Sequence, residues 1–305
     1  MTGAFGSRTA ANGVQPPGVQ LGNALYWKES RFTPLRVSAC VPLLKTVNDA
    51  CASKDLKLRY GTGDARKTVA TMAALEFRVT KRVIVFVTTH LPAPRGDKDA
   101  QAVLEQTVHA YALVREIAKF CAHIKNRAVD AVVLAGDLNC LPGRNVCQLL
   151  ERGKLPSAAV KELVANASQP DAPFLQPDGA MVCDAITLAN GADGADGADG
   201  GRHGEDAKAD EDFFWSAMKR ALGTEPVTTN HTPTFTGCLD FVYVASSPRV
   251  AWQLEAADPS AGLDLARFLP DPETGNGSDH LPVVCTLKAR FPKADAVFVL
   301  NPPPA

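Results

Sequence analysis

Four short segments of this sequence end an apolar run in polar side chains that can do chemistry. They are Thr89-His90-Leu91, Gly136-Asp137-Leu138-Asn139, Leu239-Asp240-Phe241 and Ser278-Asp279-His280. Together they supply two imidazoles, three carboxylates and an amide, which can move protons and can hold a phosphoryl group or a metal ion. Each segment alone is also typical of an ordinary turn or cap, so the prediction depends on all four.

The runs that carry these residues predict strands of a buried sheet. Residues 68–78 and 82–89 read as two β-rich runs joined by a short turn, and residues 131–135 form a continuous β-branched run. Further strand signals lie at 239–245 and 281–287. Strand ends can aim side chains from separate parts of a chain into one cleft, so we expect the four segments to meet.

Helices are expected to cover this sheet. Residues 99–124 repeat apolar side chains at the helical period, and a second helix is expected at 145–152. Residues 22–27 predict a strand, whereas 41–58 fit a helix or an irregular connection equally well. This mixture of strands and helices indicates an α/β domain.

Composition excludes some classes of protein. The chain has 305 residues, 46% hydrophobic and 21% charged, with a formal net charge of -1. That charge argues against a protein that grips nucleic acid by bulk charge, although 32 Lys and Arg could still line a local groove. No apolar run is long enough to span a membrane, and the N-terminus lacks the features of a signal or transit peptide.

The eight cysteines form no CxxC pair and mostly lie in apolar runs, so we expect buried thiols in a reducing compartment. The sequence favours an intracellular protein, and the cytoplasm over the mitochondrion or the nucleus.

The chain divides into three parts. Residues 1–18 are expected to be disordered, and 19–291 to form one domain. A Gly-Ala-Asp repeat predicts a disordered insertion at about 189–210, and 292–305 are expected to form a C-terminal tail.

Read in order, the four motifs resemble those of the endonuclease/exonuclease/phosphatase superfamily. Residues 232–243, TPTFTGCLDFVY, are similar to the segment that holds a catalytic Asp in the deadenylase, nocturnin, angel and 2′-phosphodiesterase branch. Residues 23–32, NALYWKESRF, look like a strand and turn of the same branch. The resemblance covers about residues 19–291. It implies a DNase I-like α/β fold, a four-layer sandwich of two packed mixed β-sheets flanked by helices.

The resemblance also implies a role for each motif residue. Asp137 would orient or deprotonate the attacking water, and Asn139 would hold that water or a phosphate oxygen. His280 would lie against the scissile phosphate, with Asp240 fixing its tautomer. His90 would donate to a phosphoryl oxygen, Lys67 stands where the branch often has a substrate-binding Asn, and Asp279 is the candidate metal ligand. The implied cofactor is Mg²⁺, with Mn²⁺ as a substitute.

One part of the family pattern has no counterpart. The principal magnesium ligand of the family is a Glu in a Gln-Glu-Val type motif, and no such segment precedes Val19. The expectation is therefore a chain that lacks the N-terminal portion of the domain and part of one sheet, which would leave an exposed sheet edge.

Two functions follow, and both remain open. The first is a magnesium-dependent 3′-to-5′ exoribonuclease that acts on poly(A) or on 2′,5′-oligoadenylate. The second is a degenerate, non-catalytic member that serves as an RNA-binding or interaction module. A third interpretation keeps the fold but changes the substrate to an inositol phosphate, sphingomyelin or abasic DNA.

Overall fold

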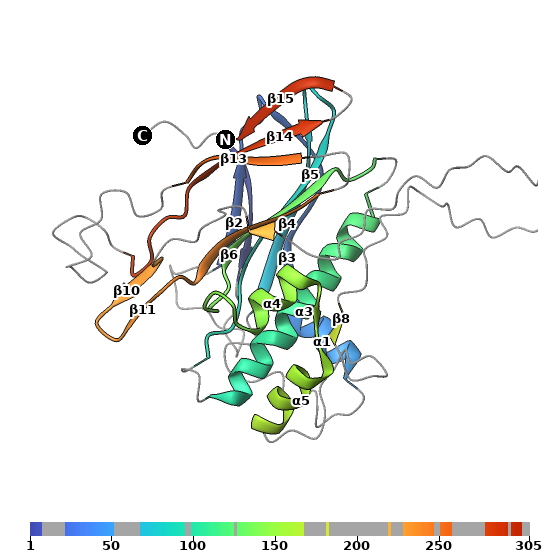
Figure 1. The fold of residues 1–305 in the computed structure, drawn as a ribbon. Helices are drawn as coiled ribbons and strands as arrows, with labels where there is room; N and C mark the ends of the chain where they lie inside the picture. Colours follow the sequence, from blue (N-terminus) through green and yellow to red (C-terminus); the bar gives the residue numbers. More distant parts are fainter. Residues whose placement is uncertain are drawn as a thin grey trace, which may run out of the picture.

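The computed structural model in Figure 1 describes residues 1–7, 22–51, 68–94, 99–124, 127–167, 181–182, 219–220, 228–246, 251–257, 278–291 and 294–300. The insertion expected at 189–210 lies outside these residues.

A six-stranded mixed sheet forms the centre of the structure. Its order is β3 (Phe32–Pro42), β4 (Val69–Phe77), β5 (Val83–His90), β6 (Ala131–Asp137), β12 (Asp240–Ser246) and β9 (Lys219–Arg220). Strands β5 and β6 are parallel, and the other neighbours are antiparallel. Every residue of β4 is buried, because layers cover the sheet on both faces.

Helices cover one face of this sheet (Figure 1). They are α1 (Leu43–Ala50), α3 (Ala100–Ala122), α4 (Asn145–Arg152) and α5 (Ser157–Asn166). The long helix α3 begins where the Asp99 side chain accepts a hydrogen bond from the Ala102 backbone N–H. Helix α4 ends at Gly153, which has a left-handed φ of 67°. The short strands β7 (Lys154–Leu155) and β8 (Met181–Val182) pair beside these helices.

Two further sheets complete the architecture. Strands β1 (Thr2–Ser7) and β2 (Gly22–Trp27) pair antiparallel, as do β13 (Ala251–Ala257), β14 (Cys285–Phe291) and β15 (Ala294–Leu300). Side chains of β1, β2 and β14 pack with those of the central sheet in a second hydrophobic core. A separate hairpin joins β10 (Asn230–Thr232) and β11 (Phe235–Gly237).

The structure confirms the α/β class, with a mixed sheet packed against further sheets and flanked by helices. The hairpin of β4 and β5 and the helices at 99–124 and 145–152 lie where the sequence predicts them. Within the segment 41–58, residues 43–50 form helix α1, and residues 52–58 lie outside the described residues. Strand β14 starts at Cys285, four residues after the apolar signal, because residues 281–284 connect the site to the strand.

Two expectations about the ends of the chain were wrong. Residues 2–7, expected to be disordered, form β1, because pairing with β2 needs backbone groups and not apolar side chains. Its small residues also allow a close approach, since a Cβ at Gly3 would lie 2.4 Å from the Tyr26 ring. Residues 294–300, expected to be a tail, form β15 on the edge of β14.

None of the helices in the described part of the chain is long and apolar enough to cross a membrane. None of the cysteines in the described residues forms a disulfide bond, and those at 51, 121, 140, 147 and 238 are buried.

Candidate active site

Three of the predicted residues lie in one row across the central sheet. His90 ends β5, Asp137 ends β6 and Asp240 begins β12. His90 is opposite Asp137 in the parallel pair, and Asp240 is opposite Asp137 in the antiparallel pair. Strand register thus brings together residues that are far apart in the sequence.

His280 joins this row from a separate segment. Its backbone forms an isolated bridge with Asn230, and the Leu281 N–H donates to the Thr229 carbonyl at 2.8 Å. The His280 Nδ1 lies 2.7 Å from Asp240 Oδ2, and its Nε2 lies 3.8 Å from Asp137 Oδ2. The imidazole therefore lies between the two carboxylates.

The Asp137 carboxylate is held from three directions. His90 Nε2 lies 3.3 Å from Asp137 Oδ2, which is also the oxygen that faces His280. The Asn139 backbone N–H donates to Asp137 Oδ1 at 2.7 Å. The side chain is only 12% exposed, so these contacts fix where its oxygens point.

The two aspartates of the site favour a positive charge on His280. Asp137 and Asp240 are directly opposite each other, and two like charges in that arrangement repel. A proton on His280 offsets this repulsion. Accordingly, the hydrogen bond to Asp240 raises the pKa of His280, burial opposes the shift, and the charges of Asp240, Asp137 and Asp279 add to it.

The loop after β6 is held by α3. Asn139 has a left-handed φ of 49° and its Nδ2 donates to the Leu91 carbonyl at 2.9 Å. Gln106 of α3 is buried, and its Nε2 lies 3.0 Å from the Pro92 carbonyl oxygen, 3.1 Å from that of Leu138 and 2.6 Å from that of Asn139. One amide thus ties the loops that follow β5 and β6 to the helix.

The start of β12 is held by a buried threonine. Thr229 Oγ1 accepts hydrogen bonds from the backbone N–H groups of Leu239 at 2.8 Å and Asp240 at 3.1 Å. The same residue accepts the Leu281 N–H through its carbonyl, so it links the Asp240 and His280 segments.

Gly136 permits the close approach of β5 and β6 at the site. A Cβ on Gly136 would lie 2.1 Å from the Thr89 carbonyl oxygen, which is a backbone atom that no rotamer change can move. Only glycine fits here without displacing a strand.

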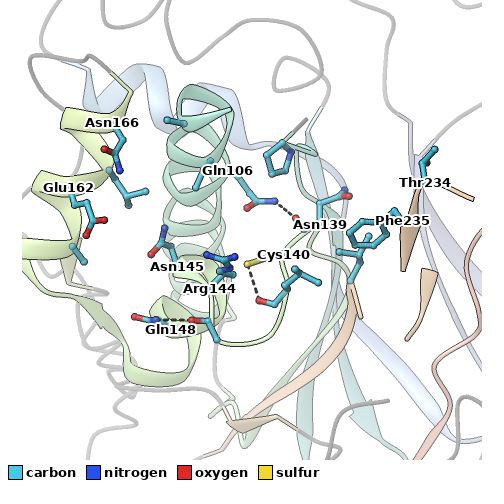
Figure 2. A pocket seen from close by; sticks show the side chains of 18 residues that line it. Gln106, Asn139, Cys140, Arg144, Asn145, Gln148, Glu162, Asn166, Thr234 and Phe235 are labelled. Atoms are coloured by element: carbon cyan, nitrogen blue, oxygen red, sulfur yellow. Dashed lines mark hydrogen bonds between the residues drawn. The ribbon is translucent and has the colours of Figure 1, made fainter. Parts of the chain in front are cut away.

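The cluster opens into two adjoining hollows. His90, Asp137, Asp240, Asp279 and His280 line a cleft of about 470 Å³ together with Asn139, Asn230 and Leu239. A larger groove of about 820 Å³ shares Asn139 and Leu239 with this cleft. Figure 2 shows the groove, with Phe235 on one side and Glu162 and Asn166 on the other.

The donor atoms fit a divalent cation. Asp137, Asp240 and His280 each offer one ligand atom, and these atoms lie within 4.8 Å of one another. Carboxylate oxygens are the ligands that Mg²⁺ prefers, and a cation would offset the repulsion between the two aspartates. The His280 Nδ1 is engaged by Asp240, so its Nε2 is the nitrogen that faces the cleft.

The structure brings six of the seven predicted residues to one cleft: His90, Asp137, Asn139, Asp240, Asp279 and His280. Asp279, the predicted metal ligand, lines the same cleft and is exposed, but it is not in the three-residue group that could hold a metal. Lys67 lies outside the described residues.

Sequence reasoning missed two positioning residues. Gln106 was missed because its three carbonyl partners lie 14 or more residues away in the sequence. Thr229, inside the run Thr228-Thr229-Asn230, carries no signal in the sequence, because its hydrogen-bond partners lie ten or more residues away.

Comparisons with known proteins support the fold. No family model matches the sequence. The chain is 23% identical over 260 residues to the probable CCR4-Not complex 3′-5′-exoribonuclease subunit Ccr4 of Vairimorpha ceranae (strain BRL01). That match covers 82% of this chain and 43% of the relative, so the chain spans less than half the length of that protein.

Solved structures give the same result. The crystal structure of ANGEL2, a 2′,3′-cyclic phosphatase, superposes with a TM-score of 0.57 at 16% identity, covering 94% of this chain and 73% of that one. The structure of ANGEL2 in complex with adenosine-2′,3′-vanadate superposes with a TM-score of 0.56 at 16% identity, and the match covers 94% of this chain and 74% of that one. The chain therefore has the fold of ANGEL2, as the resemblance to the deadenylase, nocturnin, angel and 2′-phosphodiesterase branch implied.

Proposed function

We propose that this chain is a divalent-metal-dependent phosphodiesterase that hydrolyses RNA, and that it removes nucleotides from the 3′ end of poly(A) or of 2′,5′-linked oligoadenylate. The observation that carries this proposal is the continuous chain of polar contacts from Asp240 through His280 and Asp137 to His90. The relative from Vairimorpha ceranae is described as an exoribonuclease, which supports RNA as the substrate.

Each residue has a task in this reaction. Asp137 accepts a hydrogen bond from the attacking water and orients its oxygen toward phosphorus. His280, protonated and held by Asp240, donates to a phosphoryl oxygen on which negative charge develops, and His90 donates to another. Asn139 supports the water or a phosphoryl oxygen from the loop beside Asp137. The bond from phosphorus to the leaving oxygen breaks as the bond to the water oxygen forms.

A bound Mg²⁺ or Mn²⁺ would supply Lewis-acid stabilisation of the phosphoryl oxygens. Asp137 and Asp240 are the residues that would hold it, because the protonated His280 has no free lone pair for a metal, and Asp279 is a further carboxylate at the edge of the same cleft.

The test is release of nucleotides from labelled oligoadenylates, with 3′,5′- and 2′,5′-linked substrates assayed with Mg²⁺ and with EDTA. His280→Ala should lower the rate by about 100-fold to 10,000-fold, the range for loss of an acid–base group. His123→Ala is the matched control, because His123 is exposed at the end of α3 and does not line the cleft. Equal rates in the two variants would refute the proposed role of the site.

A 2′,3′-cyclic nucleotide belongs in the same assay, because ANGEL2 is described as a 2′,3′-cyclic phosphatase. If product is released from the cyclic nucleotide alone, the proposed active site stands and the proposed substrate is replaced by the cyclic nucleotide. Binding of oligoadenylate without turnover of any substrate would favour the alternative function, a non-catalytic RNA-binding module.

A further inference from the structure

Two cysteines follow Asn139, one in the same loop and one in the helix after it. Cys140 follows Asn139 directly, and Cys147 lies in the first turn of α4. Both sulfur atoms lie near one acceptor, the Leu141 carbonyl oxygen, at 3.5 Å from Cys140 and 3.6 Å from Cys147. The two side chains also share a hydrogen bond, so their sulfur atoms are neighbours although seven positions separate the residues.

The surroundings make the two thiols unlike each other. A hydrogen bond from the Cys147 side chain lowers the pKa of Cys140, burial opposes that shift, and the charge of Arg144 assists it. The pKa of Cys147 is raised, because its proton is held in that hydrogen bond and because it is buried. By contrast, burial raises the pKa of Cys121 to about 12. Cys140 is thus favoured as the thiolate, which is the reactive form of cysteine.

Cys140 lies closer to the surface than Cys147. Cys140 is 5% exposed and lines the 820 Å³ groove beside Arg144, as Figure 2 shows, whereas Cys147 is 0% exposed and does not line it. A thiolate that lines a groove, with a second thiol behind it, is the arrangement of a reactive and a resolving cysteine.

We propose that Cys140 and Cys147 form an oxidation-sensitive pair, in which Cys140 reacts with a peroxide and Cys147 closes a disulfide. This assignment does not depend on the proposed function. Only the expected effect of oxidation on hydrolysis rests on the proposed function.

The chemistry balances with hydrogen peroxide as the oxidant. The Cys140 thiolate attacks one peroxide oxygen and the O–O bond breaks, which gives the sulfenic acid directly, and the departing hydroxide takes up a proton to become water. The Cys147 sulfur then attacks the Cys140 sulfur, the S–O bond breaks, and the Cys147 proton leaves with the hydroxyl as water. Two thiols lose two electrons in total, and the peroxide becomes two molecules of water.

The disulfide would change the catalytic loop. A bonded pair of sulfurs is about 2.05 Å apart, so both cysteines must move inward from their present hydrogen bonds to Leu141. Asn139 precedes Cys140 and carries the N–H that holds Asp137. We expect oxidation to lower hydrolysis and a dithiol reductant to restore it.

The test is peptide mapping of the purified chain after treatment with hydrogen peroxide. Trypsin cleaves after Arg144, which places Cys140 in the peptide 128–144 and Cys147 in 145–152. A disulfide therefore appears as two linked peptides that separate on reduction. Absence of this linked species, while other cysteines of the chain are oxidised, would overturn the proposal without bearing on phosphodiesterase activity.

Variants separate the two roles. Cys147→Ala should leave a sulfenic acid at Cys140 that dimedone traps, and Cys140→Ala should abolish both the adduct and the disulfide. Cys121→Ala is the matched control for loss of a buried thiol and should form the disulfide like the original chain. A dimedone adduct on Cys147 in Cys140→Ala, or no adduct on Cys140 in Cys147→Ala, would contradict the assignment.

Discussion

At the scale of single residues, the hydrogen bond between Asp240 and His280 determines the proton balance of the site. The pKa of His280 is raised, first through this bond, so the imidazolium persists to a higher pH than in a free histidine. Because the proposed reaction uses the protonated form, hydrolysis should hold below the raised pKa and be lost as the pH rises through it.

The first prediction concerns Asp240→Asn. Asparagine keeps an acceptor but removes the charge, so the pKa of His280 should fall and the basic limb of kcat/KM should move to lower pH. Asp279→Asn removes the last and smallest of the contributing charges, and should move the same limb less. The measurement is kcat/KM across about pH 5 to 9. An unmoved limb in Asp240→Asn would mean that His280 does not act as the imidazolium.

The second prediction concerns Gln106→Met, which keeps the length of the side chain and removes its donors. Carbonyl oxygens of Pro92, Leu138 and Asn139 lose a partner, which should cost about 1–3 kcal/mol of stability. The loop should also move, lowering kcat by about 10- to 100-fold with a smaller change in KM.

Gln101→Met is the control for the Gln106 variant, because Gln101 lies one turn earlier on α3 and bonds within the helix to Glu105. Equal kcat values for the two variants would exclude a positioning role for Gln106.

At the scale of elements, the sequence predicted the parts that are specified locally. Strand β6 could be predicted because five consecutive apolar residues, 131–135, are compatible with burial on both faces. Helix α4 could be predicted to the residue because its apolar period stops at Gly153. Strand β1 could not, because its sequence Thr-Gly-Ala-Phe-Gly-Ser has almost nothing to bury and forms a strand through its partner β2.

The site was predictable to the same extent. Motif residues at strand ends were found because the strands themselves carry a signal. Thr229 was not, since nothing in its neighbours reveals that its hydroxyl will meet the backbone of Asp240. Contacts of that kind arise from tertiary packing and leave no periodic trace in the sequence.

The third prediction tests the contact between β5 and β6. Gly136→Ala places a methyl group against the Thr89 carbonyl, which should destabilise the chain by about 3 kcal/mol and separate His90 from Asp137. Gly143→Ala is the control, because Gly143 has a positive φ of 78° with open space around its Cβ position among the described residues, and should cost about 1 kcal/mol. Urea unfolding measures both, and equal costs would contradict the steric argument.

At the scale of the whole molecule, β3 is an edge of the central sheet in the part of the chain that the structure describes. Val37 on this strand is 41% exposed and Leu35 is 38% exposed. An apolar edge strand is a template for pairing with another chain.

The fourth prediction follows from that edge. Val37→Lys should slow self-association at high protein concentration several-fold, because a charge on an edge strand opposes pairing. Val79→Lys adds the same charge at the turn between β4 and β5, where Val79 is 90% exposed, and should have little effect. Light scattering against time measures both. Similar slowing by both variants would indicate a general effect of charge and not of the edge.

The row of His90, Asp137 and Asp240 has a consequence for how such a protein can change over evolution. Each of these residues lies at the boundary between a paired strand and a loop, with the strand fixing its position. Phe235, Arg144 and most other residues of the larger groove, apart from Gln106, Asn139 and Leu239, lie on loops, helices and the β10–β11 hairpin outside the contacts that hold the row. Mutations can therefore reshape the groove and change the molecule that is bound, while the reacting groups stay at the spacing that strand pairing imposes.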